Sequence, residues 1–250
     1  SATVSLERTD EIRRELLANV SHDLKTPLTM IKAYSEMIRD LSGENKQKRE
    51  AHLKVIIDET DRLTRLVNDM MDLSKIESGI ITLNKEVFNF SEVATSLIDT
   101  IKMSNIDTPH KIKYSIPNDL YVLADRVKIE QVLYNLVINA IKHSGEGDRN
   151  IDIKVIATQK RIKVEVKDDG VGISKENLKH IWDRYYKASE SFTRNVQGSG
   201  LGLSIVKNIL LKHSSDFGAE SEVGKGTTFW FDLERIPKKD ALADRTNKKD

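Results

Sequence analysis

Two rows of apolar residues in the first third of the chain constrain the fold more than any other feature. They repeat at alternating intervals of three and four. The first row begins at Leu17 and runs to Leu41, and the second runs from Leu53 to Met70. The polar sequence SGEN at 42–45 separates them. Because residues at this spacing share one face of an α-helix, the pattern predicts two long helices joined by a short loop, an antiparallel helical hairpin.

The apolar stripes are wider than a single hairpin can cover. Ile57, Leu66, Met71 and Leu73 flank the second row. In a four-helix bundle made from two hairpins, each helix contacts two neighbours and buries a wider stripe. The sequence therefore predicts a homodimer.

The periodicity changes after Ser78-Gly79, where short alternating segments typical of strands begin. The fold class predicted for the whole chain is α plus α/β: a hairpin in a dimeric four-helix bundle, then an α/β sandwich. The hairpin domain is placed at 1–80 and the α/β domain at 81–236, and the charged tail at 237–250 is predicted to be disordered. Expected strands are 111–116, 152–159, 161–169 and 227–233, and expected helices are 91–104, 126–143, 174–181 and 200–213.

Composition excludes several classes of function. The formal net charge of +1 over 250 residues gives no general reason to expect binding to nucleic acid or to membrane surfaces. The chain has no cysteine, which excludes disulfides and thiolate metal sites. No apolar run approaches the ~20 residues that a membrane-spanning helix needs.

The helix expected at 126–143 carries an unusual polar strip. Asn135, Asn139, Lys142 and His143 fall within roughly 100° of arc on a helix that is otherwise mostly apolar. Asparagine is a poor helix former, and solvated faces usually carry Lys, Glu or Gln. The amide oxygens suit a hard cation, and the lysine beside them suits phosphate. An ordinary amphipathic helix remains the alternative.

Two glycine-rich segments lie further along the chain. The sequence DDGVGIS at 168–174 follows an expected strand, and by itself it is equally well an ordinary turn between a strand and a helix. The sequence GSGLGLSIV at 198–206 places three alternating glycines at the start of an apolar helix, where backbone N–H groups can meet phosphates. The polar loop before it, KASESFTRNVQ, reads as a lid over a nucleotide. No P-loop sequence occurs.

The stretch SHDLKTPLT at 21–29 combines a histidine, an acid and a proline inside an expected helix. Helical geometry turns His22 away from the seam residues Val20 and Leu24, to the outer face. A lone histidine there is usually only solvated. Pro27 removes one backbone hydrogen bond and costs ~3 kcal/mol in a helix interior. We predict a hinge at Pro27, one turn beyond His22.

Taken in order, these segments resemble the sensor histidine kinases of two-component signalling. NVSHDLKTPLT is similar to the phosphoacceptor motif, NLVINAIKHS to the N box, DDGVGIS and GSGLGLSIV to the two glycine boxes, and SEVGKGTTFWFDL to the closing strand pair. IWDRYYK resembles the F box, with Trp182 and Tyr185 where phenylalanines are common. The resemblance covers residues 10–234 and implies a Bergerat-type ATP-binding fold for the second domain.

The resemblance also implies a role for each residue of the motifs. His22 would be phosphorylated by ATP, Asp23 would orient its ring and take up its proton, and Thr26 would position water for hydrolysis of a phospho-aspartate. Asn139 would hold Mg²⁺ with Asn135 nearby. Other residues of the nucleotide site would contact the phosphates, the base or the lid: Lys142, His143, Asp168, Gly170, Gly172, Lys187, Gly198, Gly200, Leu201, Gly202, Leu203, and Thr227 or Thr228.

The function that follows is ATP-dependent autophosphorylation of His22 and phosphoryl transfer to an aspartate of a response regulator receiver domain, with phosphatase activity toward that regulator. Expected ligands are ATP and Mg²⁺. The expected location is cytoplasmic, as part of a membrane-anchored sensor, without direct membrane contact by this fragment. Two alternatives use the same ATP fold: a protein-serine kinase or anti-sigma factor, and a non-enzymatic ATP-binding scaffold. The sequence KHSSDFGAES departs from the family, which often has His-Gly-Gly there.

Overall fold

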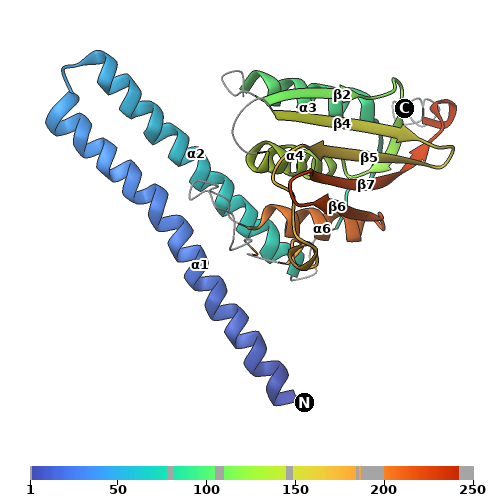
Figure 1. The fold of residues 1–250 in the computed structure, drawn as a ribbon, viewed down its shortest axis with the longest axis horizontal. Coiled ribbons are helices and arrows are strands. Elements are labelled where there is room, and N and C mark those ends of the chain that lie inside the picture. The colour runs from blue at the N-terminus through green and yellow to red at the C-terminus, as the bar shows by residue number, and fades with distance from the viewer. Residues whose placement is uncertain are drawn as a thin grey trace, which may run out of the picture. The chain divides into compact units, whose positions relative to one another are not determined.

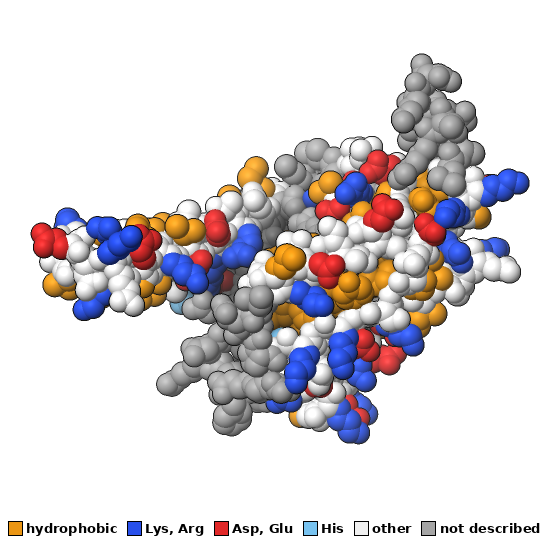
Figure 2. Space-filling model, turned by 90° about the horizontal axis from the view of Figure 1, so that it is seen from above, with side chains coloured by type: hydrophobic (Ala, Val, Ile, Leu, Met, Phe, Trp, Pro, Cys, Tyr) orange, Lys and Arg blue, Asp and Glu red, His pale blue; other side chains and the backbone are white. Residues whose placement is uncertain are grey.

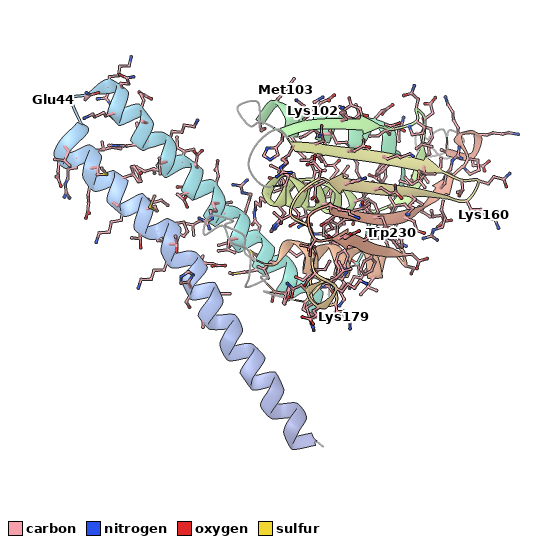
Figure 3. All side chains as sticks on the ribbon, in the orientation of Figure 1. Glu44, Lys102, Met103, Lys160, Lys179 and Trp230 are labelled. Atoms are coloured by element: carbon pink, nitrogen blue, oxygen red, sulfur yellow. The ribbon has the colours of Figure 1, made fainter. Side chains whose placement is uncertain are left out.

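Two long helices form the first part of the chain. In a computed structural model, which describes residues 2–77, 82–104, 110–144, 149–183, 186 and 200–241, α1 spans Ala2–Met37 and α2 spans Lys46–Glu77. Five residues of π-helix, η1 (Ile38–Ser42), end the first helix. Asn45 caps α2 by accepting the N–H of Lys48 at 3.0 Å. The predicted hairpin is confirmed (Figure 1), and Glu44 lies in its loop (Figure 3).

The seam of the hairpin differs from the prediction. Leu28 and Val67, expected in the seam, expose 55% and 44% of their surface, whereas Leu66, expected beside it, is buried. A row at intervals of three and four drifts around a helix, so one partner helix covers only part of the stripe. Hydrophobic side chains therefore lie among charged ones on the hairpin surface in Figure 2. The helix is continuous through Pro27, which is buried.

In the second part of the chain, the described residues form a seven-stranded sheet and the helices α3 to α6. The strands are β1 (Glu86–Asn89), β2 (His110–Ser115), β3 (Tyr121–Ala124), β4 (Arg149–Ala157), β5 (Arg161–Asp168), β6 (Phe217–Glu222) and β7 (Gly226–Ile236). Their order is β1-β3-β7-β5-β4-β2, and β6 pairs with β7. All pairs are antiparallel except β2 with β4. The helices are α3 (Phe90–Ser104), α4 (Arg126–His143), α5 (Lys175–Leu178) and α6 (Gly202–Lys212).

One face of this sheet supplies the core. Along β5, Ile162, Val164 and Val166 are buried, while the residues between them are partly exposed. Phe229 and Phe231 of β7 are buried on the same side. This period of two covers one face of the sheet with the apolar sides of α3, α4 and α6. The predicted two-layer α/β sandwich is confirmed (Figure 1). By contacts, the chain divides into two compact units, 1–77 and 78–250.

Several elements differ from the sequence prediction. The strands β1 and β3 were not predicted, because each has four residues and β3 shows no alternation, being almost wholly buried. The helix expected at 174–181 ends at Leu178. Residues 238–241, within the tail predicted to be disordered, form a helical turn that buries Ala241. The rest of that tail lies outside the described residues.

Candidate active site

The asparagine-bearing helix α4 is fixed by its cap and its apolar side. Asp125 caps the helix by accepting the N–H of Lys128 at 3.1 Å. Asn135 and Asn139 are half-buried, and Lys142 and His143 are exposed at the last turn. The strip predicted from the sequence therefore emerges from the core toward the surface. The residues that anchor the helix are Ile129, Val132, Leu133, Leu136, Val137 and Ala140.

Asn135 faces the start of α6. A Cβ on Gly202 would lie 3.6 Å from the Asn135 Oδ1, so the side chain and the glycine are neighbours. The Asn135 Nδ2 is buried and has no hydrogen-bond partner among the described residues. An unpaired buried amide is uncommon in folded proteins and marks a place where a ligand acceptor can bind.

The first turn of α6 is built for an anion. Gly200 has a φ of +69°, which a glycine adopts without strain, and Gly202 begins the helix. The buried Leu201 anchors the turn, and Leu203 is half-buried. Among the described residues, no side chain caps this end of α6, which leaves its first N–H groups and the positive end of its dipole suited to phosphate. Gly198 and Lys187 lie outside the described residues.

Asp168 ends β5 as a buried carboxylate. Its Oδ1 accepts the N–H of Gly170 at 2.9 Å and the N–H of Thr227 at 3.3 Å. Burial raises the pKa of Asp168, and the two N–H groups act in the opposite direction. The neighbouring Asp169 turns outward and accepts the N–H of Asn150 at 3.0 Å. Of the two aspartates in DDGVGIS, the structure therefore places Asp168 in the interior.

Close packing against neighbouring backbone explains the glycines after Asp168, and the sequence did not show this. A Cβ on Gly170 would overlap the carbonyl oxygen of His143 and lie 2.8 Å from the Cα of Ser144. Gly172 has a φ of +70° and stands against the carbonyl of Glu222. The first glycine box thus packs its backbone directly against the end of α4 and against β6.

The structure separates the two threonines that the sequence left as alternatives. Thr227 is buried beside Asp168, whereas Thr228 points to the other face of the strand and is partly exposed. Ser221, the first residue of the closing-strand motif and one to which the sequence assigned no role, joins this region. Its Oγ accepts the N–H of Ile173 at 2.8 Å, donates to the carbonyl of Gly226 at 2.9 Å, and lies 2.9 Å from the Thr227 Oγ1.

Trp182 of the F box packs against the core of this unit. The Trp182 ring meets Phe217 and Phe229 edge-on, with centroids 5.0 and 5.8 Å apart. Such pairs contribute beyond their buried area. The tryptophan therefore fixes the chain just before the lid sequence, and Tyr185 lies outside the described residues.

In the hairpin, His22 presents its ring to solvent. Its side chain is 80% exposed, and its Nδ1 lies 3.4 Å from the Oδ1 of Asp23, which is only 15% exposed. Adjacent residues on a helix do not share a face, so this contact depends on the rotamers that both side chains adopt. A carboxylate at Nδ1 favours the proton on that nitrogen and leaves the Nε2 lone pair outward. The Thr26 hydroxyl donates to the His22 carbonyl at 3.3 Å.

The donor set also fits a magnesium ion shared with phosphates. Among the residues that the structure describes, no group of three or more His, Cys, Asp or Glu side chains surrounds a metal-sized space. Mg²⁺ is usually held by few protein oxygens together with substrate phosphates. The amide oxygen of Asn135 beside the glycine turn, with Asn139 one helical turn further along α4, matches that pattern.

Fold and candidate site together define a class: a protein with an exposed histidine beside an aspartate on a helical hairpin, followed by an α/β sandwich with a glycine-rich helix start. Residues 12–79 match the family model of the His Kinase A (phospho-acceptor) domain. Residues 124–237 match that of the histidine kinase-, DNA gyrase B- and HSP90-like ATPases. The chain belongs to the sensor histidine kinases of two-component systems.

Relatives and solved structures agree with this assignment. The sensor histidine kinase WalK of Bacillus subtilis is 39% identical over 228 residues, which cover 91% of this chain and 37% of that protein. The chain thus spans little more than a third of this relative. Histidine kinase ThkA, solved in complex with the response regulator protein TrrA, has a TM-score of 0.64 at 26% identity, covering 93% and 65% of the two chains. Histidine kinase AdeS of Acinetobacter baumannii shares the fold, with a TM-score of 0.66 at 23% identity, covering 86% and 98%.

Within the described part of the chain, no helix is long and apolar enough to cross a bilayer.

Proposed function

We propose that this chain binds Mg·ATP in its α/β unit and transfers the γ-phosphoryl group to His22. The single observation that carries the proposal is the exposed His22 ring beside the Asp23 carboxylate, in a chain that also holds an ATPase-family domain. The adenine amino group would donate to the buried Asp168, with Thr227 beside it. The phosphates would lie at the first turn of α6, near Asn135, with Lys142 neutralising part of their charge.

The chemistry at His22 follows from its tautomer. The Nε2 lone pair attacks the γ-phosphorus, the bond from that phosphorus to the β,γ-bridging oxygen breaks, and ADP leaves. The ring becomes an imidazolium as the N–P bond forms, and Asp23 stabilises the Nδ1 proton and then accepts it. When bound at Asn139, with Asn135 nearby, Mg²⁺ would offset charge on the phosphate oxygens.

The next acceptor would be an aspartate on a response regulator. ThkA, the relative solved with a response regulator, supports this kind of partner. Homodimerisation is supported by uncovered apolar residues on α2, because Leu53, Ile57, Val67 and Met71 are 38–58% exposed and lie within about 80° of arc. Thr26, on the face that carries His22, would position water for hydrolysis of the phospho-regulator.

The rival functions make different predictions. A serine kinase of the same ATP fold does not need the phosphoacceptor hairpin, which this chain has in full. A scaffold would bind ATP without transferring phosphate. The phosphoacceptor-domain match and the outward Nε2 of His22 favour the kinase.

The test is incorporation of label from γ-labelled ATP with Mg²⁺. The unaltered protein should be labelled, and the label should be lost in acid and kept in base, as phosphohistidine requires. His22→Gln should abolish labelling while leaving nucleotide binding intact. His52→Gln, in the same hairpin, is the matched control and should be labelled normally. Label that survives acid, or that persists in His22→Gln, would refute the proposal.

A further inference from the structure

His213, at the end of α6, is a buried histidine that the proposed chemistry does not use. It is 8% exposed, and its Nδ1 lies 2.8 Å from the carbonyl oxygen of Ile209. Its Nε2 accepts the backbone N–H of Asp125 at 3.0 Å. A carbonyl can only accept and an amide N–H can only donate, so the two partners fix the neutral tautomer with the proton on Nδ1. Burial lowers the pKa of His213, which favours this uncharged form.

The partner of His213 begins the asparagine-bearing helix. Asp125 is the cap of α4, and its Oδ2 also accepts the N–H of Asn84, in the segment that leads into β1. The His213 ring therefore joins the last turn of α6 to the first turn of α4. These positions are 88 residues apart in sequence.

The first residue of α6 meets the middle of α4 at the proposed nucleotide site, where Gly202 lies against Asn135. From Asp125 to Asn135 is ten residues, and from Gly202 to His213 is eleven. At 1.5 Å per residue these spans are about 15 and about 16 Å, so α6 runs antiparallel to the first half of α4 and contacts it at both of its own ends. The His213–Asp125 hydrogen bond and the Gly202–Asn135 contact together set the register of α6 along α4.

The turn after His213 holds the ring in place, and it requires a strained backbone conformation at Ser214. The N–H of Ser215 donates to the carbonyl of Leu210 at 3.0 Å, and that of Ser214 donates to Leu211 at 3.0 Å. This is a Schellman ending, and Ser214 takes the position usually given to glycine, with a φ of +57°. The fold keeps this strained geometry, which points the chain away from α6 and leaves the His213 ring against α4.

We propose that His213 is a positioning residue for the nucleotide site: through the Asp125 N–H it fixes where the glycine turn of α6 stands relative to Asn135. This inference rests on the proposed function. Losing the hydrogen bond would let α6 shift along α4 and would misplace the N–H groups that face the phosphates. The expected consequence is weaker ATP binding with little change in the rate of transfer from bound ATP.

Two substitutions at position 213 each keep one of the two hydrogen bonds of His213 and lose the other. In His213→Gln, the side-chain oxygen can reach the place of Nε2 and accept the Asp125 N–H, while the bond to Ile209 is lost. In His213→Asn, the amide reaches only the place of Nδ1, so Ile209 keeps its donor and Asp125 loses its acceptor. The two variants thus differ in which contact they retain.

The experiment measures affinity for a non-hydrolysable ATP analogue, the KM and kcat of labelling, and the backbone amide shifts of Gly202. We expect His213→Asn to weaken binding and raise KM about tenfold, as expected for one lost hydrogen bond, with kcat within about threefold. His213→Gln should bind within about threefold of the unaltered protein. The Gly202 amide should shift in His213→Asn and stay in place in His213→Gln.

Equal effects of the two variants on affinity and on the Gly202 amide would overturn the positioning role, because a merely structural histidine would give that result. Failure of the unaltered protein to bind the analogue would instead contradict the proposed function. The Gly202 shifts, measured without nucleotide, would still decide the role of His213 in that case.

Discussion

The two units of this chain hold their reactive groups in opposite ways. In the hairpin, His22 is 80% exposed and its geometry depends on one neighbouring carboxylate. In the α/β unit, Asp168 and Thr227 are buried and are held by backbone groups from several elements. In the proposed function, the hairpin would present a nucleophile to more than one partner, whereas the α/β unit would shape one pocket. Exposure serves the first task, and dense packing serves the second.

The largest effect should come from filling the tight space in the α/β unit. Gly170→Ala places a methyl group against the backbone of His143 and Ser144, which cannot move aside without shifting α4. We expect a loss of more than about 2 kcal/mol in the free energy of unfolding of this unit, and loss of nucleotide binding. Both tryptophans, Trp182 and Trp230, lie in this unit, so their fluorescence during denaturation follows it alone.

Gly224→Ala is the matched control for that substitution. Gly224 has a φ of +80°, but a Cβ there would meet no atom within 4 Å. Only backbone strain applies, and we expect a loss of about 1 kcal/mol with nucleotide binding unchanged. Equal losses in the two variants would show that packing against α4 is not what requires Gly170.

The second effect concerns the face that the hairpin leaves uncovered. Ile57 is 58% exposed, and Ile57→Glu would place an unpaired charge in the proposed dimer interface. Because burying such a charge costs several kcal/mol, we expect dimer dissociation to become at least about 100-fold easier, measured by analytical ultracentrifugation. Gln47→Glu adds the same charge away from the exposed stripe and should leave the dimer intact. An unaltered dimer in Ile57→Glu would refute this interface.

The third effect separates function from stability in the α/β unit. Asp168→Asn keeps an oxygen that accepts the N–H groups of Gly170 and Thr227 but removes the charge. It also replaces an acceptor with a donor where the adenine amino group would bind. We expect nucleotide affinity to fall by about tenfold or more, measured by calorimetry.

Asp168→Asn should lower nucleotide affinity without lowering the free energy of unfolding. Burial raises the pKa of Asp168 in the folded state, so the folded protein holds that proton more tightly than the unfolded chain. The stability that this group contributes is present below the unfolded pKa of about 3.9 and is lost as the pH rises through the folded value. At pH 7 the variant should therefore be as stable as the unaltered protein or more stable, and the difference should vanish in acid. A less stable variant at pH 7 would contradict this assignment.

The smallest effect concerns the proline beside the exposed histidine. Pro27→Ala restores an N–H that can donate to the Asp23 carbonyl. If Pro27 acts as a hinge, the dimer should persist while the ratio of kinase to phosphatase activity changes several-fold. This ratio is measured with the phosphorylated regulator and labelled ATP. An unchanged ratio would refute the hinge. In the structure, α1 is one continuous helix through Pro27.

The sequence predicted the long periodic elements well. The helix expected at 126–143 is α4 with the same bounds, because its apolar period and its aspartate cap are both local features. The hairpin was equally clear. The four-residue strands β1 and β3 were missed, since segments that short carry no clear period of their own, and β3 is also almost wholly buried.

The sequence predicted the motifs of the candidate site but not which of their side chains contact one another. Asn135 and the α6 glycines were singled out from residue type and spacing, and the role expected for Asp168 came from the resemblance to the family. Ser221 and His213 were given no role at the site, because a single serine or histidine has no signal until its partners are known. The choice between Thr227 and Thr228 also needed the pleat of β7, which turns neighbouring side chains to opposite faces.

By itself, the sequence determined the local properties of this protein: where the long periodic helices lie, where glycines recur before a helix, and which histidine stands beside an acid. Those properties depend on neighbours within a few residues. The tertiary structure decided which groups are buried and what they contact. Asp168 meets Thr227 across 59 residues and Asp125 meets His213 across 88, and such contacts are created only when the sheet and its helices close on one core.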